Sequence, residues 1–373
     1  MDLRKYLYSI IVDELKGIIA FIIRSVLWPF SIAYGLLVKS VVKLYQWRVL
    51  KPVRVGCKVI SIGNITLGGT GKTPVVEWIA NIIKDKGIKA AVLLRGYGRA
   101  TAERKPSVVR NGSRMRDVGD EAYVLGKNLK GIPIIVGRDR IEGAREAIKA
   151  FGAEAVILDD GFQHWRIARD LDIVTIDTTN PFGNGATIPR GTLREPISHL
   201  GRADIFILTR SNVDKGNIPY LKNILRKLNP PAVIAESIHK PSHFEVLTDE
   251  NRKVEISAMT NRRVCILSAI GNPVAFDNMA EGLFLEVAMR AHFVDHHNYT
   301  KSDIEKVLER SKDAGIKDIV TTQKDAVKLE AIFASLKDKM ASYGIQILVL
   351  RSHIEITSGE DILIGRLDSI LSR

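Results

Sequence analysis

From residue 58 onward, short apolar runs alternate with amphipathic stretches along the chain. The segment KVISIGNI predicts a strand, TLGGTGKT a loop, and PVVEWIANIIKDKG a helix that ends near Gly87. Strands rich in β-branched residues and Leu, separated by helices, are typical of a parallel α/β sheet covered on both faces. The further predicted strands of this sheet are AAVLLRGYG, PIIVG, AEAVILDD, DIVTID and DIFILTR.

The same pattern divides the 373 residues into parts. Residues 1–50 are predicted to form helices, and residues 51–231 an α/β domain that ends at a Pro-Pro pair. Residues 232–260 are predicted to be a linker. Residues 261–373 are predicted to form a second, smaller α/β domain that begins near RRVCILSAIG. Two domains agree with the usual size of about 100–200 residues each.

The N-terminal segment is apolar at helical spacing. The three- and four-residue spacing predicts an amphipathic helix, with Asp13, Lys16 and Arg24 on its other side. Pro29 is expected to kink or end this helix, and a second apolar stretch follows over residues 32–42. The apolar stripe consists of Leu15, Ile18, Ile19, Ile22, Ile23, Val26 and Leu27.

Several structures could account for this segment. A signal peptide is disfavoured because acidic residues precede the apolar stretch and no small-residue cleavage site follows. Arg24 and Pro29 interrupt the roughly 20 apolar residues that a spanning helix needs. A helix lying at a membrane surface fits best, while a helical hairpin packed on the protein's own core is the alternative. The aromatic residues available at headgroup level are Trp28, Tyr34, Tyr45 and Trp47.

The charge distribution supports a membrane surface. The formal net charge is +13, and the first 58 residues contain 10 of the 55 Lys and Arg residues but only 3 of the 42 Asp and Glu residues. A segment that is both basic and apolar favours an anionic membrane over nucleic acid.

The two cysteines, Cys57 and Cys265, have no metal-ligand spacing, which is typical of a reducing compartment and disfavours a structural zinc site.

A glycine-rich loop follows the first predicted strand. It reads Thr66-Leu67-Gly68-Gly69-Thr70-Gly71-Lys72-Thr73. The glycines let backbone N–H groups surround phosphate oxygens, the lysine can reach β- and γ-phosphates, and the threonine can hold Mg²⁺. The GxxxxGK[ST] pattern is missed only at its first position, where Thr66 replaces Gly. A Gly-rich turn with an incidental Lys is the alternative, but the strand–loop–helix context favours a phosphate-binding loop.

Two carboxylates stand at the end of a predicted buried strand. The segment AVILDDGFQH places Asp159 and Asp160 at the carboxyl edge of the sheet, where ligands bind in open α/β folds. Adjacent carboxylates there can hold Mg²⁺ or a water molecule on it. A simple strand-to-turn Asp-Gly pair would explain an isolated DDG, but the phosphate loop upstream favours the metal role.

Further polar residues follow or precede predicted elements. Asp120 and Glu121 open a predicted helix, where they can also stabilise its N-terminus. Arg140, in a GRDR segment after a strand, is expected at the ligand edge. The long loop after DIVTID has two arginines, Arg190 and Arg194, that could clamp phosphate. A loop of this length in a compact domain is usually functional or disordered.

Two C-terminal clusters carry weaker signals. Asp295-His296-His297 resembles part of a zinc site, but it lacks an HExxH frame and a nearby Cys, so surface histidines before a capped helix are favoured. The segment from Thr300 to Asp303 matches a TKxD guanine-specificity pattern, but it opens a helix instead of ending a strand. We expect a capping box there, formed by Ser302 and Glu305.

Together these motifs resemble the tetraacyldisaccharide 4'-kinase family of lipid A biosynthesis. The resemblance covers residues 58–329, and a basic apolar N-terminal helix is also usual in that family. In VGDEA, Ala122 stands where Pro is expected, which affects only a local turn. The matching segments are, in order, ISIGNITLGGTGKTP, LLRGYGR, VGDEA, GRDR, ILDDGFQHWRIARDLDI, PFGNGATIPRGTLREP, AIGNP, FVDHHNYT and TTQKDAVKL.

The resemblance implies a fold and an activity. The expected fold is a P-loop NTPase-like parallel sheet domain with an amphipathic membrane helix and a smaller α/β domain. The implied reaction is phosphorylation of the 4'-hydroxyl of tetraacyldisaccharide 1-phosphate, with ATP and Mg²⁺ as cofactors, to form the lipid IVA precursor. The implied location is the cytoplasmic face of the bacterial inner membrane, as a peripheral or monotopic protein. The implied partners are the acylated disaccharide lipid and the membrane surface, and not nucleic acid.

The resemblance also implies roles for single residues. Asp120 is implied as the base that takes the sugar hydroxyl proton, and His296 as the residue that supports it. Asp159 and Asp160 are implied as active-site acids. The implied metal ligands are Thr73, Asp160 and Glu195, and the implied active-site neighbours are Arg140, Gln163, His164 and Arg194.

Other functions remain open at this point. Another P-loop ATPase or kinase acting at the membrane surface is the main alternative. A partitioning-type ATPase is disfavoured because Leu67 stands where that class has a lysine. A soluble small-molecule kinase would have no use for the apolar N-terminal stripe.

Overall fold

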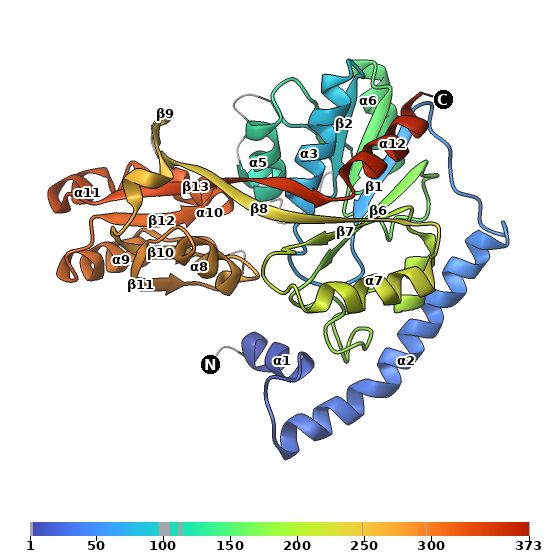
Figure 1. The fold of residues 1–373 in the computed structure, drawn as a ribbon, viewed down its shortest axis with the longest axis horizontal. Helices are drawn as coiled ribbons and strands as arrows, with labels where there is room; N and C mark the ends of the chain where they lie inside the picture. Colours follow the sequence, from blue (N-terminus) through green and yellow to red (C-terminus); the bar gives the residue numbers. More distant parts are fainter. Residues whose placement is uncertain are drawn as a thin grey trace.

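The protein consists of two α/β domains and a pair of N-terminal helices (Figure 1). The structure is a computed structural model, and it describes residues 3–96, 105–110, 113, 115–247, 249–295 and 297–372. Within these residues the strands join one 13-stranded sheet in the order β11-β10-β12-β13-β8-β7-β6-β1-β5-β2-β4-β3, with β9 paired to β8 outside this path. The predicted α/β fold is therefore confirmed.

The first domain contains the glycine-rich loop, and we call it the phosphate-loop domain. Its central strands pair in parallel, with β1 between β5 and β6. The six strands predicted from residue 58 to residue 210 are all present, and a short seventh, β3, was not predicted. The strands are β1 (Lys58–Gly63), β2 (Ala90–Leu94), β3 (Ser107–Val108), β4 (Ile134–Val136), β5 (Ala155–Asp159), β6 (Leu171–Asp177) and β7 (Ile205–Thr209).

Both faces of this sheet are buried. In β5, Ala155 and Ile157 pack into one apolar core, while Val156 and Leu158 pack into the core on the opposite face. Successive side chains of a strand point to opposite faces, so a strand that is covered on both sides is apolar throughout. The covering helices are α3 (Lys72–Asp85), α4 (Met115–Val118), α5 (Asp120–Asn128), α6 (Arg140–Phe151), α7 (Asn217–Leu228) and the 3₁₀ helix η1 (Ile197–Arg202).

The second domain is smaller and follows the same plan. Strands β10, β11, β12 and β13 pair in parallel, as the apolar runs after residue 261 predict. Its elements are β9 (Asp249–Val254), η2 (Ile256–Met259), β10 (Arg263–Ser268), α8 (Pro273–Glu281), β11 (Glu286–His292), α9 (Lys301–Asp313), β12 (Asp318–Thr322), α10 (Gln323–Phe333) and α11 (Lys337–Tyr343).

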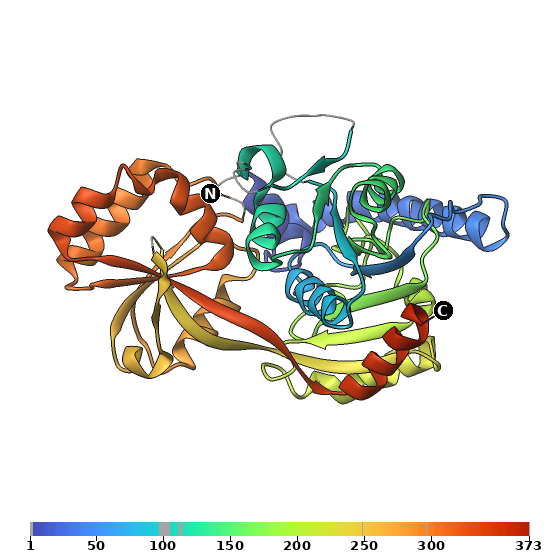
Figure 2. The ribbon, with the colours of Figure 1, turned by 90° about the horizontal axis from the view of Figure 1, so that it is seen from above.

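Two long antiparallel strands connect the domains, as the view from above shows (Figure 2). Strand β8 (Val233–Val246) leaves the phosphate-loop domain, and β13 (Gln346–Ser358) returns to it. The segment expected to be a linker, residues 232–260, therefore contains the strands β8 and β9 (Asp249–Val254). Its burial alternates, and it includes Pro241 and charged residues, so its sequence lacks the apolar run of the central strands.

The C-terminal helix also differs from the expected domain division. Helix α12 (Glu360–Leu371) begins after Gly359, and it packs on the phosphate-loop domain although it lies within the residues assigned to the smaller domain. Leu363 and Leu367 are fully buried in the core that also contains Ile60 and Val75. The chain thus enters the smaller domain through β8 and leaves it through β13.

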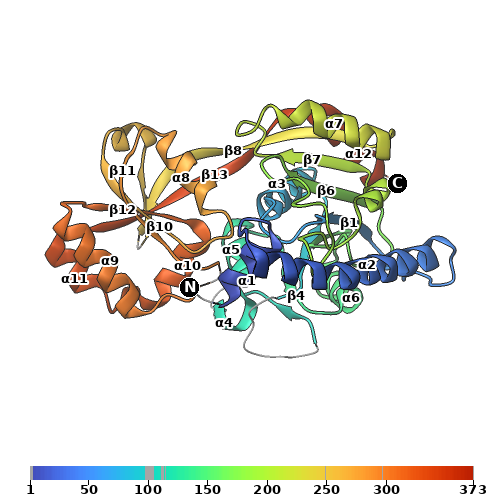
Figure 3. The same ribbon diagram turned by 90° about the horizontal axis from the view of Figure 1, so that it is seen from below.

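The N-terminal helices lie along one side of the phosphate-loop domain, with α1 toward the smaller domain (Figure 3). Helix α1 spans Leu3–Ile11 and α2 spans Ile18–Gln46. Pro29 does not end the helix, since α2 continues through it, and the expected kink stays a prediction. Arg24 does not interrupt the apolar face either, because its guanidinium turns back to Asp13 and to the carbonyls of Ile10 and Leu15.

Among the described residues, α2 is the one helix long and apolar enough to cross a membrane, and only 11% of its most apolar window is buried. Its exposed apolar side chains include Ile18, Ile19, Phe21, Ile22, Val26, Trp28, Phe30, Ile32, Leu36 and Leu37. Most of this helix therefore does not pack on the protein's own core.

Candidate active site

The glycine-rich loop has the backbone that phosphate binding needs. Gly68 and Gly71 have φ angles of 107° and 78°, a region that side-chain-bearing residues rarely adopt. Gly71 is the residue before α3, so the loop ends at a helix N-terminus whose N–H groups are available to an anion. Thr70 is hydrogen-bonded to strands β6 and β7. Its hydroxyl lies 2.8 Å from the hydroxyl of Thr175 in β6, and its carbonyl accepts from Thr209 in β7 at 3.0 Å.

The lysine of this loop faces the acidic strand end. Lys72 Nζ donates to Asn64 Oδ1 at 3.2 Å and lies 3.5 Å from Asp160 Oδ1. The close approach of β1 and β5 at this edge requires glycine at position 63, where a Cβ would lie 2.6 Å from that of Phe162. The predicted meeting of the loop and the carboxylates is therefore present.

The carboxylate of Asp160 pairs with two positively charged side chains, those of Lys72 and Arg194. Arg194 Nη1 donates to both of its carboxylate oxygens, at 2.8 and 2.7 Å. Burial opposes ionisation, but Lys72 and Arg194 outweigh it and hold the pKa of Asp160 below its usual value. Asp160 is an ionised carboxylate at neutral pH and has a positive φ of 54°. Its conformation turns the side chain toward the loop.

Asp159 is different. It is buried, and its Oδ1 has no hydrogen-bond partner among the described residues. Burial is the largest cause that raises its pKa to about 7, the carboxylate of Glu121 adds to it, and Lys72 opposes it. A buried, unpartnered carboxylate oxygen beside a phosphate loop fits a bound cation, which would replace the proton.

Glu195 is engaged on all sides. It is fully buried, and His199 Nδ1, Arg202 Nη1 and Gln163 Nε2 lie 2.7, 2.8 and 3.1 Å from its carboxylate oxygens. These donors outweigh burial and lower the pKa of Glu195. In this structure Glu195 anchors Gln163, which in turn lies 3.3 Å from Arg194. Its expected contact with a metal stays a prediction.

Two further predicted active-site neighbours, Arg140 and His164, are placed as follows. Arg140 is almost fully buried and donates to the carbonyls of Gly137, at 2.7 Å, and Asp159, at 3.1 Å. Arg140 therefore holds the backbone around Asp159. Burial, followed by the charge of Arg140, lowers the pKa of His164 to about 4, so this imidazole is neutral.

Asp120 is the first residue of α5, after Gly119. Its Oδ1 accepts from the backbone N–H of Glu121 at 2.9 Å. Helix α5 packs beside α3, the helix that follows the phosphate loop, and Asn128 Nδ2 donates to Glu77 Oε1 at 2.8 Å. His296, the expected partner of Asp120, lies outside the described residues, so their contact stays a prediction.

The smaller domain reaches this site through two residues that the sequence reading did not single out. Lys324, at the start of α10, lies 3.5 Å from Glu121 Oε1 and 3.9 Å from Asp120 Oδ2. Burial would lower the pKa of Lys324, but Glu121, Asp120 and Asp295 raise it. A Cβ on Gly271 would lie 3.9 Å from Gly69 N. Lys324 lies in the family segment TTQKDAVKL and Gly271 in AIGNP. Their place in these segments is the sequence feature that could have pointed to the two residues.

The structure tests the predictions made for residues 300–305 and describes the surroundings of His297. Thr300 to Asp303 does open a helix, but the capping box is formed by Thr300 and Asp303, not by Ser302 and Glu305. The carboxylate of Asp303 also lies 3.0 Å from His297 Nε2. His297 stacks on Phe293, which makes it part of the local packing of the smaller domain.

The fold and the site define a P-loop nucleotide-binding protein of the α/β class, with an acidic strand end and an arginine opposite the loop. The model of the family described as tetraacyldisaccharide-1-P 4'-kinase matches residues 23–371. The chain belongs to this family, which is a family of kinases.

Individual relatives agree with this assignment. A tetraacyldisaccharide 4'-kinase of Halothermothrix orenii is 35% identical over 373 residues, with 96% of each chain covered. One of Anaeromyxobacter sp. (strain K) is 38% identical, with 88% of this chain and 86% of the relative covered. The crystal structure of "apo" form LpxK from Aquifex aeolicus in complex with ATP has a TM-score of 0.72 and 25% identity, and covers 94% of this chain and 99% of that one.

Proposed function

We propose that this protein transfers the γ-phosphoryl group of ATP to the 4'-hydroxyl of tetraacyldisaccharide 1-phosphate. The observation that carries the proposal is the meeting of Lys72 with Asp160 at 3.5 Å, at the carboxyl edge of the sheet, in a chain of this kinase family. Related proteins that carry the kinase name cover nearly the whole chain, which supports the same reaction.

The chain's own groups neutralise the transferring phosphoryl group. The loop from Gly68 to Thr73 presents backbone N–H groups, and Lys72 and Arg194 add two positive charges. Phosphoryl transfer depends mainly on such positioning and charge stabilisation, because little covalent chemistry falls to the protein.

Mg²⁺ fits the acidic strand end. Thr73 and the pair Asp159–Asp160 would hold it, and the unpartnered Oδ1 of Asp159 is the observation that supports this. When bound, the ion would neutralise charge on the β- and γ-phosphates. Glu195 is a weaker candidate ligand, because Arg202, His199 and Gln163 already occupy its oxygens.

Asp120 is the proposed base for the sugar hydroxyl. An aspartate with an unperturbed pKa of about 3.9 is a weak base, so it needs a partner, for which we propose His296. Lys324 Nζ lies 3.9 Å from Asp120 Oδ2 and forms an ion pair with it. Since Lys324 and His296 belong to the smaller domain, the proposed catalytic group depends on contact between the two domains.

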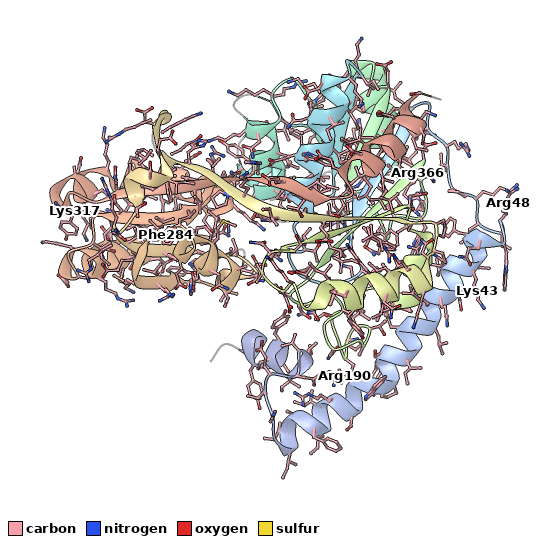
Figure 4. All side chains as sticks on the ribbon, in the orientation of Figure 1. Lys43, Arg48, Arg190, Phe284, Lys317 and Arg366 are labelled. Carbon is pink, nitrogen blue, oxygen red and sulfur yellow. The ribbon has the colours of Figure 1, made fainter. Side chains whose placement is uncertain are left out.

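The acylated substrate explains the N-terminal helices. We propose that α2 lies on the cytoplasmic face of the inner membrane, with its exposed apolar side chains among the lipids. The middle of α2 is hydrogen-bonded to a polar loop of the phosphate-loop domain, which favours lying along the surface over crossing it. Lys43 and Arg48, near the end of α2, add attraction to anionic lipid (Figure 4).

The test is transfer of labelled γ-phosphate from ATP to tetraacyldisaccharide 1-phosphate in mixed micelles, with the product's new phosphate located at the 4' position. The wild-type chain is expected to form this product, and Lys72→Ala to lose it. ATP hydrolysis without transfer to the lipid would instead support the alternative, another P-loop ATPase at the membrane surface.

A further inference from the structure

One loop of the phosphate-loop domain lies between helix α2 and the glycine-rich loop. This β6–η1 loop covers residues 178–196. On the α2 side, Ser31 Oγ donates to the carbonyl of Thr187 at 2.6 Å, and Thr187 Oγ1 donates to the carbonyl of Ser31 at 2.8 Å. Tyr34 Oη donates to the carbonyl of Arg194 at 2.9 Å.

The other side of the same loop is bonded to the nucleotide site. The backbone N–H of Leu67 donates to the carbonyl of Thr192 at 2.7 Å, and the N–H of Arg194 donates to the carbonyl of Ile65 at 2.7 Å. Ile65 and Leu67 directly precede the phosphate-binding glycines. The loop thus bridges α2 and the strand end that carries the phosphate loop.

Arg194 joins all three parts. Its backbone N–H donates to the carbonyl of Ile65, just after β1. Its carbonyl accepts from the hydroxyl of Tyr34, and its guanidinium donates to Asp160. A displacement of α2 would remove the hydroxyl that the carbonyl of Arg194 bonds. Conformations with α2 in place and with Arg194 on Asp160 therefore favour each other.

A second attachment fixes the turn before α2 to the same loop. Arg190 Nη2 lies 3.0 Å from Asp13 Oδ1, and Asn184 Nδ2 donates to the carbonyl of Ile11 at 2.7 Å. Figure 4 labels Arg190 at this junction. The few polar groups of α2 that face the domain are used by the loop, while neighbouring Phe30 and Ile32 remain exposed at 60% and 53%.

We propose that contact of α2 with lipid is transmitted to the ATP site through the hydrogen bond between Tyr34 and Arg194, so that lipid and nucleotide bind cooperatively. Tyr34 is a positioning residue, since it acts through Arg194. The proposal rests on the proposed seating of α2 at a membrane. Because the coupling is a difference in binding free energy, it is reciprocal: lipid tightens ATP binding by the same factor by which ATP tightens lipid binding.

The experiment measures ATP affinity of the full chain with and without vesicles of phosphatidylethanolamine and phosphatidylglycerol. In the wild type, vesicles are expected to tighten ATP binding by about fivefold, the size of one net hydrogen bond. ATP is expected to increase co-sedimentation with vesicles by the same factor. Tyr34→Phe keeps the ring and removes only the hydroxyl, so it should abolish the coupling while vesicle binding without nucleotide stays at the wild-type level.

Tyr45→Phe is the matched control. Tyr45 is on the same helix and its ring lies 6.5 Å from that of Trp165, away from the β6–η1 loop. This variant should keep the full coupling. With the lipid substrate, Tyr34→Phe should lower kcat and leave KM for the lipid unchanged, whereas a loss of membrane anchoring alone would raise KM.

Two results would overturn the proposal: wild-type ATP affinity that vesicles do not change, or full coupling in Tyr34→Phe. Failure of the wild type to bind vesicles would overturn both the membrane seating and the coupling. The vesicles contain no disaccharide substrate, so the result is separate from the proposed reaction. Coupling without phosphoryl transfer would overturn only the reaction, and transfer without coupling only this inference.

Discussion

At the scale of single residues, two positively charged side chains, those of Lys72 and Arg194, pair with one carboxylate, that of Asp160. Both carboxylate oxygens of Asp160 accept from Arg194 Nη1, and its Oδ1 lies 3.5 Å from Lys72 Nζ. A charge-assisted pair of this kind is directional, because the guanidinium has a fixed planar shape. The guanidinium of Arg194 is therefore oriented toward Asp160, beside the phosphate loop.

Arg194→Lys tests this orientation. The substitution keeps the positive charge, but the shorter ammonium group does not reproduce the position of Nη1, which bonds both oxygens of Asp160 and lies 3.3 Å from Gln163 Oε1. We therefore expect kcat to fall by about tenfold or more with little change in protein stability. Arg166→Lys is the matched control, because the side chain of Arg166 is 66% exposed and its nearest carboxylate, that of Asp139, lies 3.9 Å away. Steady-state kinetics with the lipid substrate measures both. Equal activity of Arg194→Lys and wild type would show that charge alone suffices.

Asp159 predicts a pH-dependent stability that Mg²⁺ should reverse. Its folded-state pKa of about 7 exceeds the unfolded value of about 3.9. The folded state thus binds the extra proton between these values, and stability contributed by the protonated form is lost as pH rises from about 4 to about 7. Without Mg²⁺, wild type should lose stability relative to Asp159→Asn over this range.

Urea unfolding at pH 5 and pH 7, with and without Mg²⁺, measures this difference. Mg²⁺ should stabilise the wild type at pH 7 and have a smaller effect on Asp159→Asn, because the amide is a poorer ligand than the carboxylate. The same response to Mg²⁺ in both proteins would argue against Asp159 as a ligand.

At the scale of elements, α12 is the helix whose place in the molecule is least evident from its position in the chain. It follows the smaller domain in sequence, yet Leu363 is fully buried in the core of the phosphate-loop domain. Leu363→Ala should therefore lower the free energy of unfolding by about 2–5 kcal/mol and weaken ATP binding at 37 °C. Ile362→Ala, at a neighbouring position that is 66% exposed, is the control and should have little effect. Denaturant unfolding curves compare the two.

The elements also show which parts of the fold the sequence predicts. Strands such as β5, apolar from Ala155 to Leu158 because both faces are covered, are evident from composition alone. Strand β8 was not, because its burial alternates and it includes Pro241. Helix α2 continues through Pro29, which local propensity does not favour.

The site divides in the same way. Lys72 and Asp160 could be placed together because a phosphate loop and a strand end share one edge of the sheet. Lys324 and Tyr34 could not, since their contacts with Asp120 and Arg194 join segments far apart in sequence. The local motif around Thr300 predicted a helix start but not which residues cap it, because several residues nearby can do so.

At the scale of the whole molecule, the exposed apolar side of α2 predicts membrane binding that can be separated from folding. The double variant Ile22→Glu, Phe30→Glu puts charge on this side, where the two side chains are 55% and 60% exposed, so vesicle co-sedimentation should fall strongly while Tm stays within a few degrees. Phe284→Glu, at a residue of the smaller domain that is 74% exposed, is the control. Figure 4 labels Phe284 far from α2. Equal co-sedimentation of both variants would exclude α2 as the membrane contact.

The outward strand β8 and the returning strand β13 give the molecule the architecture of a domain insertion. Ile238 and Glu355 face each other across this antiparallel pair, so the chain leaves the phosphate-loop domain and re-enters it at neighbouring points. A short hairpin turn could join these two positions without disturbing the rest of the sheet. The smaller domain thus has the topology of an inserted unit, and a chain in which these two positions were joined would keep α12 on the phosphate-loop domain but lose Lys324.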